Sequence, residues 1–559
     1  MFRLSLFVCI FFIALLPVSL SGQDALFQCL DKQLNSINKT FQLQELPPYF
    51  IDFRVNENKY TYLQYSSGNL VQDNTIHNRV MTISTRVGNY REDNTTVTDI
   101  EGYGNYGDNY QSFHLPVEND SMAINHVIRK EIDRNYKKVL QDYKSNINGK
   151  SDKKEKKDTI PAFSTEEPSV YSEPPIDKLV DGSFIVRWKK ILKEVSDLFA
   201  QDTNIVMNEL SLTVSNERIY YLNSEGTRIV QNRPQIMLYV FPVIVTKERN
   251  LVPLFNSYVA KNVDGLPGRD QLIDDCNDML VMLNELRKAP LADPYAGPSI
   301  FSPEAAGVIF HEIFGHRIEG QRMRSEYDGQ TFLDKIGKKV LLDGLTLEFN
   351  PTIQDYKGLP LFGSYRYDDE GVKSEPVIVV EKGTLKDFLM SRTPTKTHLK
   401  SNGHGRAQAG MAPFSRQSNL IVKSEKGETD ETLRKMLIKE CKKQNKNYGY
   451  LIKEVFGGFT NTMVFSPQVF NIMPTLVYRI YTDGRPDELV RGVTFIGTPL
   501  SVFSEIIAYG SKYEVFNGFC GAESGSVPVS TVSPSLLIKK IETQKMPDSK
   551  VQLPVIPKP

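Results

Sequence analysis

One short stretch with two histidines constrains this chain more than any other. Segment 303–320 starts with proline and glutamate, which suit a first helical turn, and continues through an apolar run. It then places Glu312 directly after His311, and His316 five residues beyond His311. Imidazole is the commonest transition-metal ligand, and a glutamate beside it can act as a general base. The stretch therefore predicts a helix that carries a metal site.

The spacing of the two histidines does not suit a regular helix. Side chains five residues apart on an α-helix point about 140° away from each other, too far to bind one ion. A π-type turn would bring the rings together, and Gly315 is where the backbone can deform most easily. We therefore expect a distorted helix, although so short a pattern also occurs by chance.

The first 22 residues have the pattern of a secretory signal peptide. Arg3 supplies a positive charge, residues 4–16 form an apolar core, and residues 17–22 contain small residues suited to cleavage. The apolar run is too short for a comfortable membrane span. We expect cleavage near residue 22 and export to the periplasm or the exterior. An uncleaved membrane anchor is the alternative.

Composition excludes some partners. The 559 residues include 67 basic and 67 acidic side chains, so the chain has no net positive charge that would attract nucleic acid or an acidic membrane. We expect neither nucleic-acid binding nor stable membrane insertion. Beyond residue 22 the chain has four cysteines, Cys29, Cys276, Cys441 and Cys520, too few for a disulfide scaffold of this size.

The first half of the chain predicts a sheet with helices. Alternating apolar and polar residues in 24–120 indicate strands, with a hairpin that turns at 66–69. A similar hairpin spans 216–245, and the two can be neighbours in one antiparallel sheet. Helical spacing of apolar residues predicts helices at 121–143, 184–201 and 268–288. Segment 144–175 is rich in lysine, acidic residues, serine and proline, and is expected to be a mobile excursion.

Prolines at 290–298 mark a predicted domain boundary. The expected fold class is α+β, with an N-terminal domain at 23–290 that combines an antiparallel sheet with helices. A β-rich C-terminal domain at 291–559 then carries the His-Glu helix. A further helix is predicted near 430–444.

Several motifs resemble the TldD/PmbA family of metallopeptidases. The resemblance starts at Tyr295-Ala-Gly-Pro298 and runs through the whole stretch 301–320. Further motifs follow in the family's order: Asp368-Asp369-Glu370-Gly371, Ser391-Arg392, Gly403-x-Gly405-Arg406, Arg416-x-Ser418-Asn419, Arg491-Gly492-Val493, Ile496-Gly497, Gly518-Phe519-Cys520-Gly521 and Val527-Pro528-Val529. The resemblance covers nearly all of the chain after the predicted signal peptide.

The resemblance implies a zinc site with three protein ligands, His311, His316 and Cys520, and one Zn²⁺ per active subunit. A catalytic zinc needs three protein ligands and one open position, and the glycines around Cys520 let its sulfur approach another element. His398 and His404 are competing third ligands. Glu312 would be the catalytic residue, as general base on a zinc-bound water.

Roles for the remaining polar residues stay open. Glu319 can orient a ligand imidazole or be an exposed carboxylate at the end of the helix. Residues 368–370 are most simply an exposed acidic turn, and contact of Asp369 with a substrate amine is the minority interpretation. His404 and Arg406 can bind an oxyanion or a peptide carboxylate, but structural roles are expected.

The resemblance implies a zinc-dependent metallopeptidase that hydrolyses short or unfolded peptides inside a closed chamber. The family forms dimers, so a homodimer or a heterodimer with a related subunit is expected. The leader peptide and segment 144–175 distinguish this chain from most of the family. Two alternatives remain: a non-catalytic binding or assembly subunit with a structural metal site, and a hydrolase of a non-peptide amide.

Overall fold

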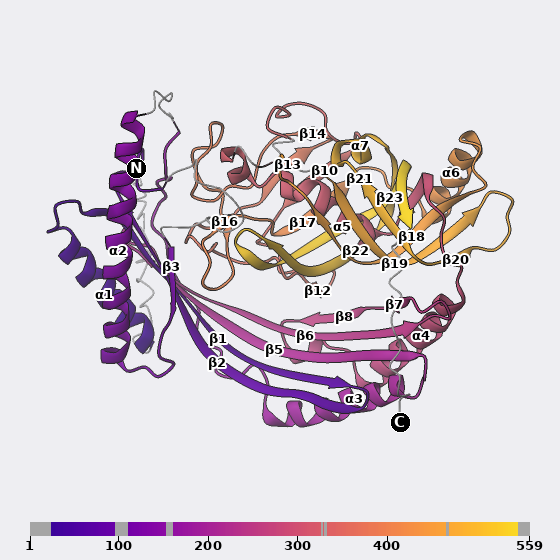
Figure 1. Ribbon diagram of the computed structural model, residues 1–559, viewed down its shortest axis with the longest axis horizontal. Coiled ribbons are helices and arrows are strands. Elements are labelled where there is room, and N and C mark those ends of the chain that lie inside the picture. The colour runs from indigo at the N-terminus through magenta and orange to yellow at the C-terminus, as the bar shows by residue number, and fades with distance from the viewer. Residues whose placement is uncertain are drawn as a thin grey trace, which may run out of the picture.

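The computed structural model describes residues 24–95, 110–152, 160–325, 328, 332–465 and 469–545. The predicted signal peptide lies outside these residues. Two large sheets, one in each half of the chain, face each other and dominate the molecule (Figure 1). Helices accompany both sheets, and the second half is richer in strands, which confirms the predicted α+β class.

Two long antiparallel hairpins build the N-terminal sheet. Strands β1 (Pro48–Ser66) and β2 (Asn69–Val87) form one, and β5 (Ile205–Asn223) and β6 (Arg228–Val245) form the other. Pairing of β1 with β5 makes the hairpins neighbours, as their sequence likeness suggests. Shorter strands complete the sheet: β3 (Tyr110–His114) beside β2, and β4 (Val170–Ser172), β7 (Leu251–Pro253) and β8 (Asn256–Ala260) beside β6.

Four helices accompany this sheet. α1 (Ala25–Phe41) and α2 (Ser121–Asp152) cover one end, and α3 (Gly182–Ala200) and α4 (Arg269–Lys288) lie under the other (Figure 1). The predicted helices correspond to α2, α3 and α4. Helix α1 occupies a segment where strands were expected. Asp24 caps it by accepting the Phe27 N–H, and one apolar face is buried at Leu26, Leu30, Leu34 and Ile37.

The segment predicted to be a mobile excursion is largely structured where it is described. Residues 144–152 continue α2, while 153–159 lie outside the described residues. Beyond them, the Phe163 ring is buried beneath the guanidinium groups of Arg86 and Arg392, at 3.9 and 4.1 Å from its centroid. Strand β4 pairs with β6. Residues 160–175 therefore form no loose excursion, because one buried ring and a strand pairing hold them despite their polar composition.

The C-terminal sheet closes partly on itself around one long strand, β23 (Gly525–Lys545). This strand pairs with β9 (Tyr295–Phe301), β17 (Asn419–Ser424), β21 (Val493–Gly497) and β22 (Ile506–Ala522). Strands β18 (Tyr448–Thr460) and β19 (Phe470–Tyr481) complete the ring between β9 and β21. The remaining strands are β10 (Leu345–Phe349), β11 (Asp355–Tyr356), β12 (Leu359–Pro360), β13 (Val377–Glu381), β14 (Thr384–Leu385), β15 (Gly405–Arg406), β16 (Phe414–Ser415) and β20 (Glu488–Val490).

Helix α5 (Pro303–Ile309) starts directly after β9 and is buried in this half of the molecule. Helix α6 (Asp430–Lys443), predicted from its spacing, packs through Leu433, Leu437 and Cys441 against β9 and β23. Helix α7 (Pro499–Ser504) is short. Of the described helices, none has the length and apolar character needed to cross a membrane.

Buried charges join the two halves of the chain. Asp369 pairs with Arg233 on β6 at 2.9 Å, and Arg392 pairs with Glu225, just after β5, at 2.8 Å. The expectation that 368–370 form an exposed acidic turn is wrong. Their side chains are buried because backbone N–H groups of the following loops bind them: Gly405 donates to Asp368, Ala407 to Asp369 and Arg392 to Glu370.

Candidate metal centre

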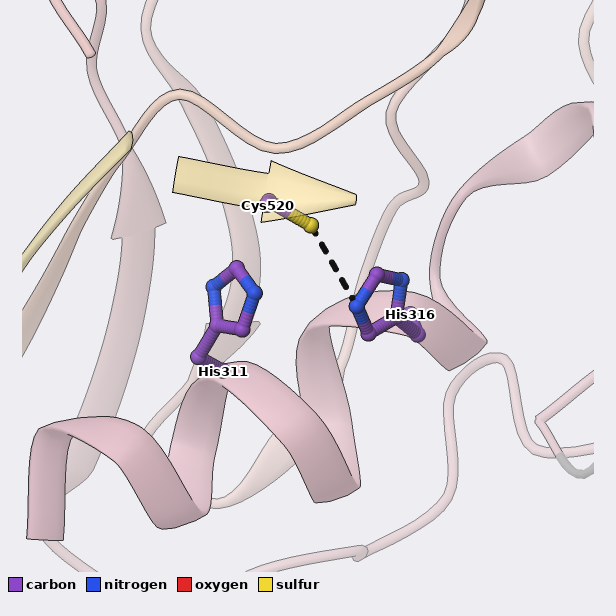
Figure 2. A group of neighbouring side chains, drawn as sticks. All are labelled: His311, His316 and Cys520. Carbon is purple, nitrogen blue, oxygen red and sulfur yellow. Dashed lines mark hydrogen bonds between the residues drawn. The ribbon is translucent and has the colours of Figure 1, made fainter. Parts of the chain in front are cut away.

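The histidine helix changes its winding at the point where the two histidines need it. Ser302 caps α5 by accepting the Ala305 N–H, and Pro303 occupies the first turn. The next turn, Phe310–Phe314, is a π-helix, closed by a hydrogen bond from the Gly315 N–H to the Phe310 carbonyl. This i to i+5 turn brings His311 and His316 to one side of the chain (Figure 2).

Gly315 makes room for a support of this wide turn. A Cβ at position 315 would lie 1.9 Å from the Gln417 side-chain oxygen. Gln417 in turn donates from Nε2 to the His311 carbonyl at 3.2 Å, and its side chain is buried. Glycine at this position thus lets a distant loop support the His311 backbone.

Cys520 reaches the histidines from strand β22, opposite Val527 on β23. Its Sγ lies 3.4 Å from His316 Nε2, and one donor atom from each of the three residues lies within 4.8 Å of the others (Figure 2). All three side chains are buried. The structure therefore brings together the three residues predicted as metal ligands.

Charges within the cluster favour a thiolate. Burial alone would raise the pKa of Cys520, but His316, Arg416 and His311 together hold that pKa well below its usual range. Burial likewise opposes the charge on His316, while Cys520 and Glu319 raise the His316 pKa well above its usual range. Thiolate is the form of cysteine that binds metals, so the third donor is prepared for an ion.

A buried chain of charges orients His316. Its Nδ1 lies 3.1 Å from Glu319 Oε2, and because a carboxylate only accepts, Nδ1 carries a proton and Nε2 is the atom that would bind a metal ion in place of its own proton. Glu319 also accepts from Arg322 Nη2 at 2.8 Å, and Arg322 donates to Glu523 Oε2 at 2.7 Å. Against the cost of burial, His316 and Arg322 lower the pKa of Glu319 to about 2.

Of the two interpretations of Glu319, the structure shows the oriented carboxylate, which is only 1% exposed. Sequence reasoning missed Arg322 and Glu523. The spacing of three residues between Glu319 and Arg322 is a signal for the first of these, since such pairs are neighbours on a helical turn. The pairing with Glu523 depends on the fold.

Glu312 lies beside the cluster and at a cavity. Its Oε2 is 4.0 Å from His316 Nε2. Burial raises the pKa of Glu312, although the nearby histidines partly oppose that shift. His311 and Glu312 both line a cavity of about 290 Å³. A Cβ at Gly458 would lie 2.8 Å from Glu312 Cγ, so the glycine there leaves room for this carboxylate.

The donor set fits a zinc ion. Zinc distances of about 2.3 Å to sulfur and about 2.1 Å to nitrogen place the two donors about 3.6 Å apart in a tetrahedron. The observed separation of Cys520 Sγ and His316 Nε2 is 3.4 Å. Three donors with one position left over is also the arrangement of a catalytic zinc site.

The other candidates lie outside this group. His398 pairs with Asp387 at 2.8 Å, and His404 is fully buried between Asn402 and Ser418, where burial lowers its pKa to about 3. Arg406 donates to the Gln417 carbonyl and lies over the Tyr365 ring. His404, Arg406 and Asp369 are not among the residues that line the cavity at His311.

A larger cavity, of about 660 Å³, lies between the start of α1 and strands β4 and β5. Its lining includes none of the three clustered residues. Two of its charged groups are paired: Arg218 with Asp24, and Glu57 with Arg79, which lies outside the lining.

Comparisons with known proteins agree on one family. Residues 295–545 match the family described as PmbA/TldA metallopeptidase C-terminal domain. A metalloprotease of Methanothermobacter thermautotrophicus is 31% identical over 43% of this chain and 48% of its own length. A protein of Saccharolobus solfataricus named zinc metalloprotease TldD homolog is 26% identical over 47% of this chain and 54% of its own length. The matched region thus spans about half of each of these two relatives.

A solved structure shows the same fold over most of the chain. TldE from Thermococcus kodakarensis superimposes with a TM-score of 0.60 at 14% identity, over 92% of this chain and 99% of that one. The fold and the site thus define a protein with a buried His-His-Cys cluster that can hold a metal. Its sequence and fold are similar to those of the TldD/PmbA family, most specifically at residues 295–545.

Proposed function

We propose that this chain is a zinc-dependent metallopeptidase that hydrolyses short or unfolded peptides. The observation that carries the proposal is the position of Glu312, buried beside the donors His311, His316 and Cys520 and lining the same cavity as His311. The name of the Saccharolobus solfataricus relative supports zinc as the ion.

Each residue of the site has a separate role in the proposed reaction. His311, His316 and Cys520 would hold the zinc ion, which would supply Lewis acidity toward water and the scissile carbonyl. Glu312 accepts a proton from the attacking water and returns it to the leaving amine. Its raised pKa makes it a stronger base than an exposed glutamate. Glu319, itself held by Arg322, fixes the orientation of the His316 ring, so that Nε2 points toward the place where the metal would bind.

The cavity supports a small or extended substrate. Its volume of about 290 Å³ lies just below the range for ligand sites, roughly 300–1,000 Å³. A folded protein surface does not fit such a space, whereas one or two residues of an extended peptide do.

Separating metal binding from chemistry tests this proposal. Glu312→Ala should keep zinc, because Glu312 is not one of the three donors, and should slow peptide cleavage by roughly 10²- to 10⁴-fold. Cys520→Ala should lower the zinc content itself, because it removes a donor. Zinc would be measured by elemental analysis and cleavage with a peptide library, on variants matched by circular dichroism. Full activity of Glu312→Ala, or cleavage that survives chelation, would contradict the proposal.

The outcome also separates the alternatives. A structural metal site predicts that ligand loss weakens assembly while Glu312→Ala changes nothing. A hydrolase of a non-peptide amide predicts zinc binding without cleavage of any peptide in the library.

We also propose export and a dimeric state. The leader pattern at residues 1–22 supports export, and sequencing of the N-terminus should find a start near residue 22 or 23. The likeness in fold to TldE supports a related subunit as partner, in addition to a second copy of this chain.

A further inference from the structure

The cavity at Glu312 is lined by aromatic side chains from both halves of the molecule. Tyr239 on β6 and Phe255, the residue directly before β8 in the sequence, come from the N-terminal half. Phe456 comes from β18. The Tyr239 and Phe255 rings stack with centroids 5.5 Å apart, and Phe255 meets Phe456 edge to face at 5.3 Å. The three rings form one continuous wall, called here the aromatic wall.

Other side chains of the lining are also apolar. Phe516 and Phe519 come from β22, on either side of Gly518, and Met473 comes from β19. Several of these side chains are unusually exposed for their type: Phe456 is 43%, Phe519 44% and Met473 37% exposed. Exposed apolar area of this kind marks a surface that is covered by a ligand or partner.

Charge is scarce in this cavity. Among its described lining residues, Glu312 is the one carboxylate, and lysine and arginine are missing. An acidic ligand group would be repelled by Glu312, and a basic group would lose its hydration without gaining a second partner. The lining therefore suits an uncharged apolar group.

We propose that this cavity is a specificity pocket that takes an aromatic or large aliphatic side chain of the substrate peptide, next to the bond that is cut. The proposal rests on the proposed peptidase function. The occupant is a peptide side chain because the same cavity is lined by His311 and Glu312, so a group held by the aromatic wall lies within one residue of the reacting centre. Burying such a side chain removes apolar area from water on both partners.

Glycines keep the pocket open. Gly457, Gly458 and Gly518 all line it and carry no side chain that would fill the space. At Gly457 an added Cβ would meet no atom within 4 Å, which shows free space at this position. The pocket therefore combines apolar walls with room for a ring.

A peptide pair tests the pocket. One peptide consists of glycine, serine and alanine, and its partner carries a single phenylalanine in the same sequence. The zinc-loaded wild-type protein should cut beside the phenylalanine, with a kcat/KM at least about 10-fold above that for the peptide without phenylalanine, since even one methylene in an apolar pocket gives roughly 10- to 200-fold. Mass spectrometry locates the cut.

The matched variants are Phe456→Ala and Phe459→Ala. Both phenylalanines lie on β18 and both are exposed, but Phe459 does not line the cavity. Phe456→Ala should lose most of the preference for the phenylalanine peptide, measured as the ratio of the two kcat/KM values. Phe459→Ala should keep the preference. Equal loss in both variants would overturn the proposal.

The design separates this proposal from the peptidase function. Cleavage of both peptides at equal rates overturns the pocket and leaves the peptidase standing. If the wild-type protein cuts neither peptide, the peptidase function fails, and fluorescence anisotropy then decides on the pocket: Glu312→Ala should bind the labelled phenylalanine peptide at least about 10-fold more tightly than the other. A change of oligomeric state in Phe456→Ala without any change in preference would instead assign the aromatic wall to a subunit contact, and would also overturn the proposal.

Discussion

A single buried carboxylate, Glu319, links the metal donors to the rest of the site. It lies between His316 and Arg322 and is also 3.6 Å from Arg416, whose guanidinium group donates to the Cys520 carbonyl. One residue thus positions an imidazole donor and contacts the arginine that holds the strand with the thiolate. Partners of metal ligands of this kind set both ring orientation and metal affinity.

Glu319→Gln tests this role. Glutamine keeps the size of the side chain but removes the charge that both His316 and Arg322 face, so zinc affinity should fall by roughly 10- to 100-fold. Competition with a chromogenic chelator measures that affinity. Lys338→Ala, on an exposed side chain outside the site, is the control. An unchanged zinc affinity in Glu319→Gln would show that the carboxylate does not position His316.

At the scale of elements, the centre depends on a π-helical turn that follows a regular helix. The turn is possible because Gly315 admits the Gln417 side chain, which supports the His311 carbonyl. A loop more than a hundred residues away therefore determines how the histidine helix is wound.

Gly315→Ala should disturb this arrangement. The added methyl group would meet Gln417 at 1.9 Å, so the amide must move and the turn should shift toward regular helix, with the histidines farther apart. We expect zinc affinity to fall by roughly 10-fold or more, and stability by about 1–3 kcal/mol from overpacking. Isothermal titration with zinc and urea unfolding measure the two effects. Gly484→Ala is the stability control. Gly484 has open space around it, so an alanine there should lower stability only through the positive φ of that position.

The sequence predicted the helix, its distortion and the likeness to the TldD/PmbA family, because histidine spacing and motif order are local signals. It also predicted both N-terminal hairpins and three of their helices from periodicity. It missed α1 because Asp24 and a single apolar face are weak signals next to long alternating strands. It missed Gln417, Arg322 with Glu523, and the aromatic wall, because those contacts join residues far apart in the chain. Burial of 368–370 was missed for the same reason.

Across the whole molecule, buried charges link the two sheets. Asp52 on β1 lies near this junction: it accepts the Ser84 N–H and the Tyr221 hydroxyl within the N-terminal sheet, and Tyr221 lies against Gly371 of the C-terminal half. Burial raises the pKa of Asp52 to about 6, although Arg54 and Arg86 partly oppose this. The carboxyl group is therefore protonated more readily in the folded chain than in the unfolded one.

Stability should consequently depend on pH through Asp52. Because the folded state binds the proton more tightly, the contribution of Asp52 is complete below about pH 4 and is lost as the pH rises through about 6. Relative to Asp52→Asn, which does not ionise, the wild-type protein should lose about 3 kcal/mol of unfolding free energy between pH 4 and 7. Urea unfolding of both proteins across this range measures the difference. A constant difference between the two would contradict the assignment.

Cys520 contributes its donor atom from β22, and β22 is held in place by β23, the last described strand of the chain. A ribosome makes the two histidines some two hundred residues before this cysteine. A chain still being synthesised therefore carries the helix but no complete centre. The metal centre is complete only after the β22–β23 hairpin has joined the sheet, which under the proposed function would delay peptide cleavage until the chain has folded.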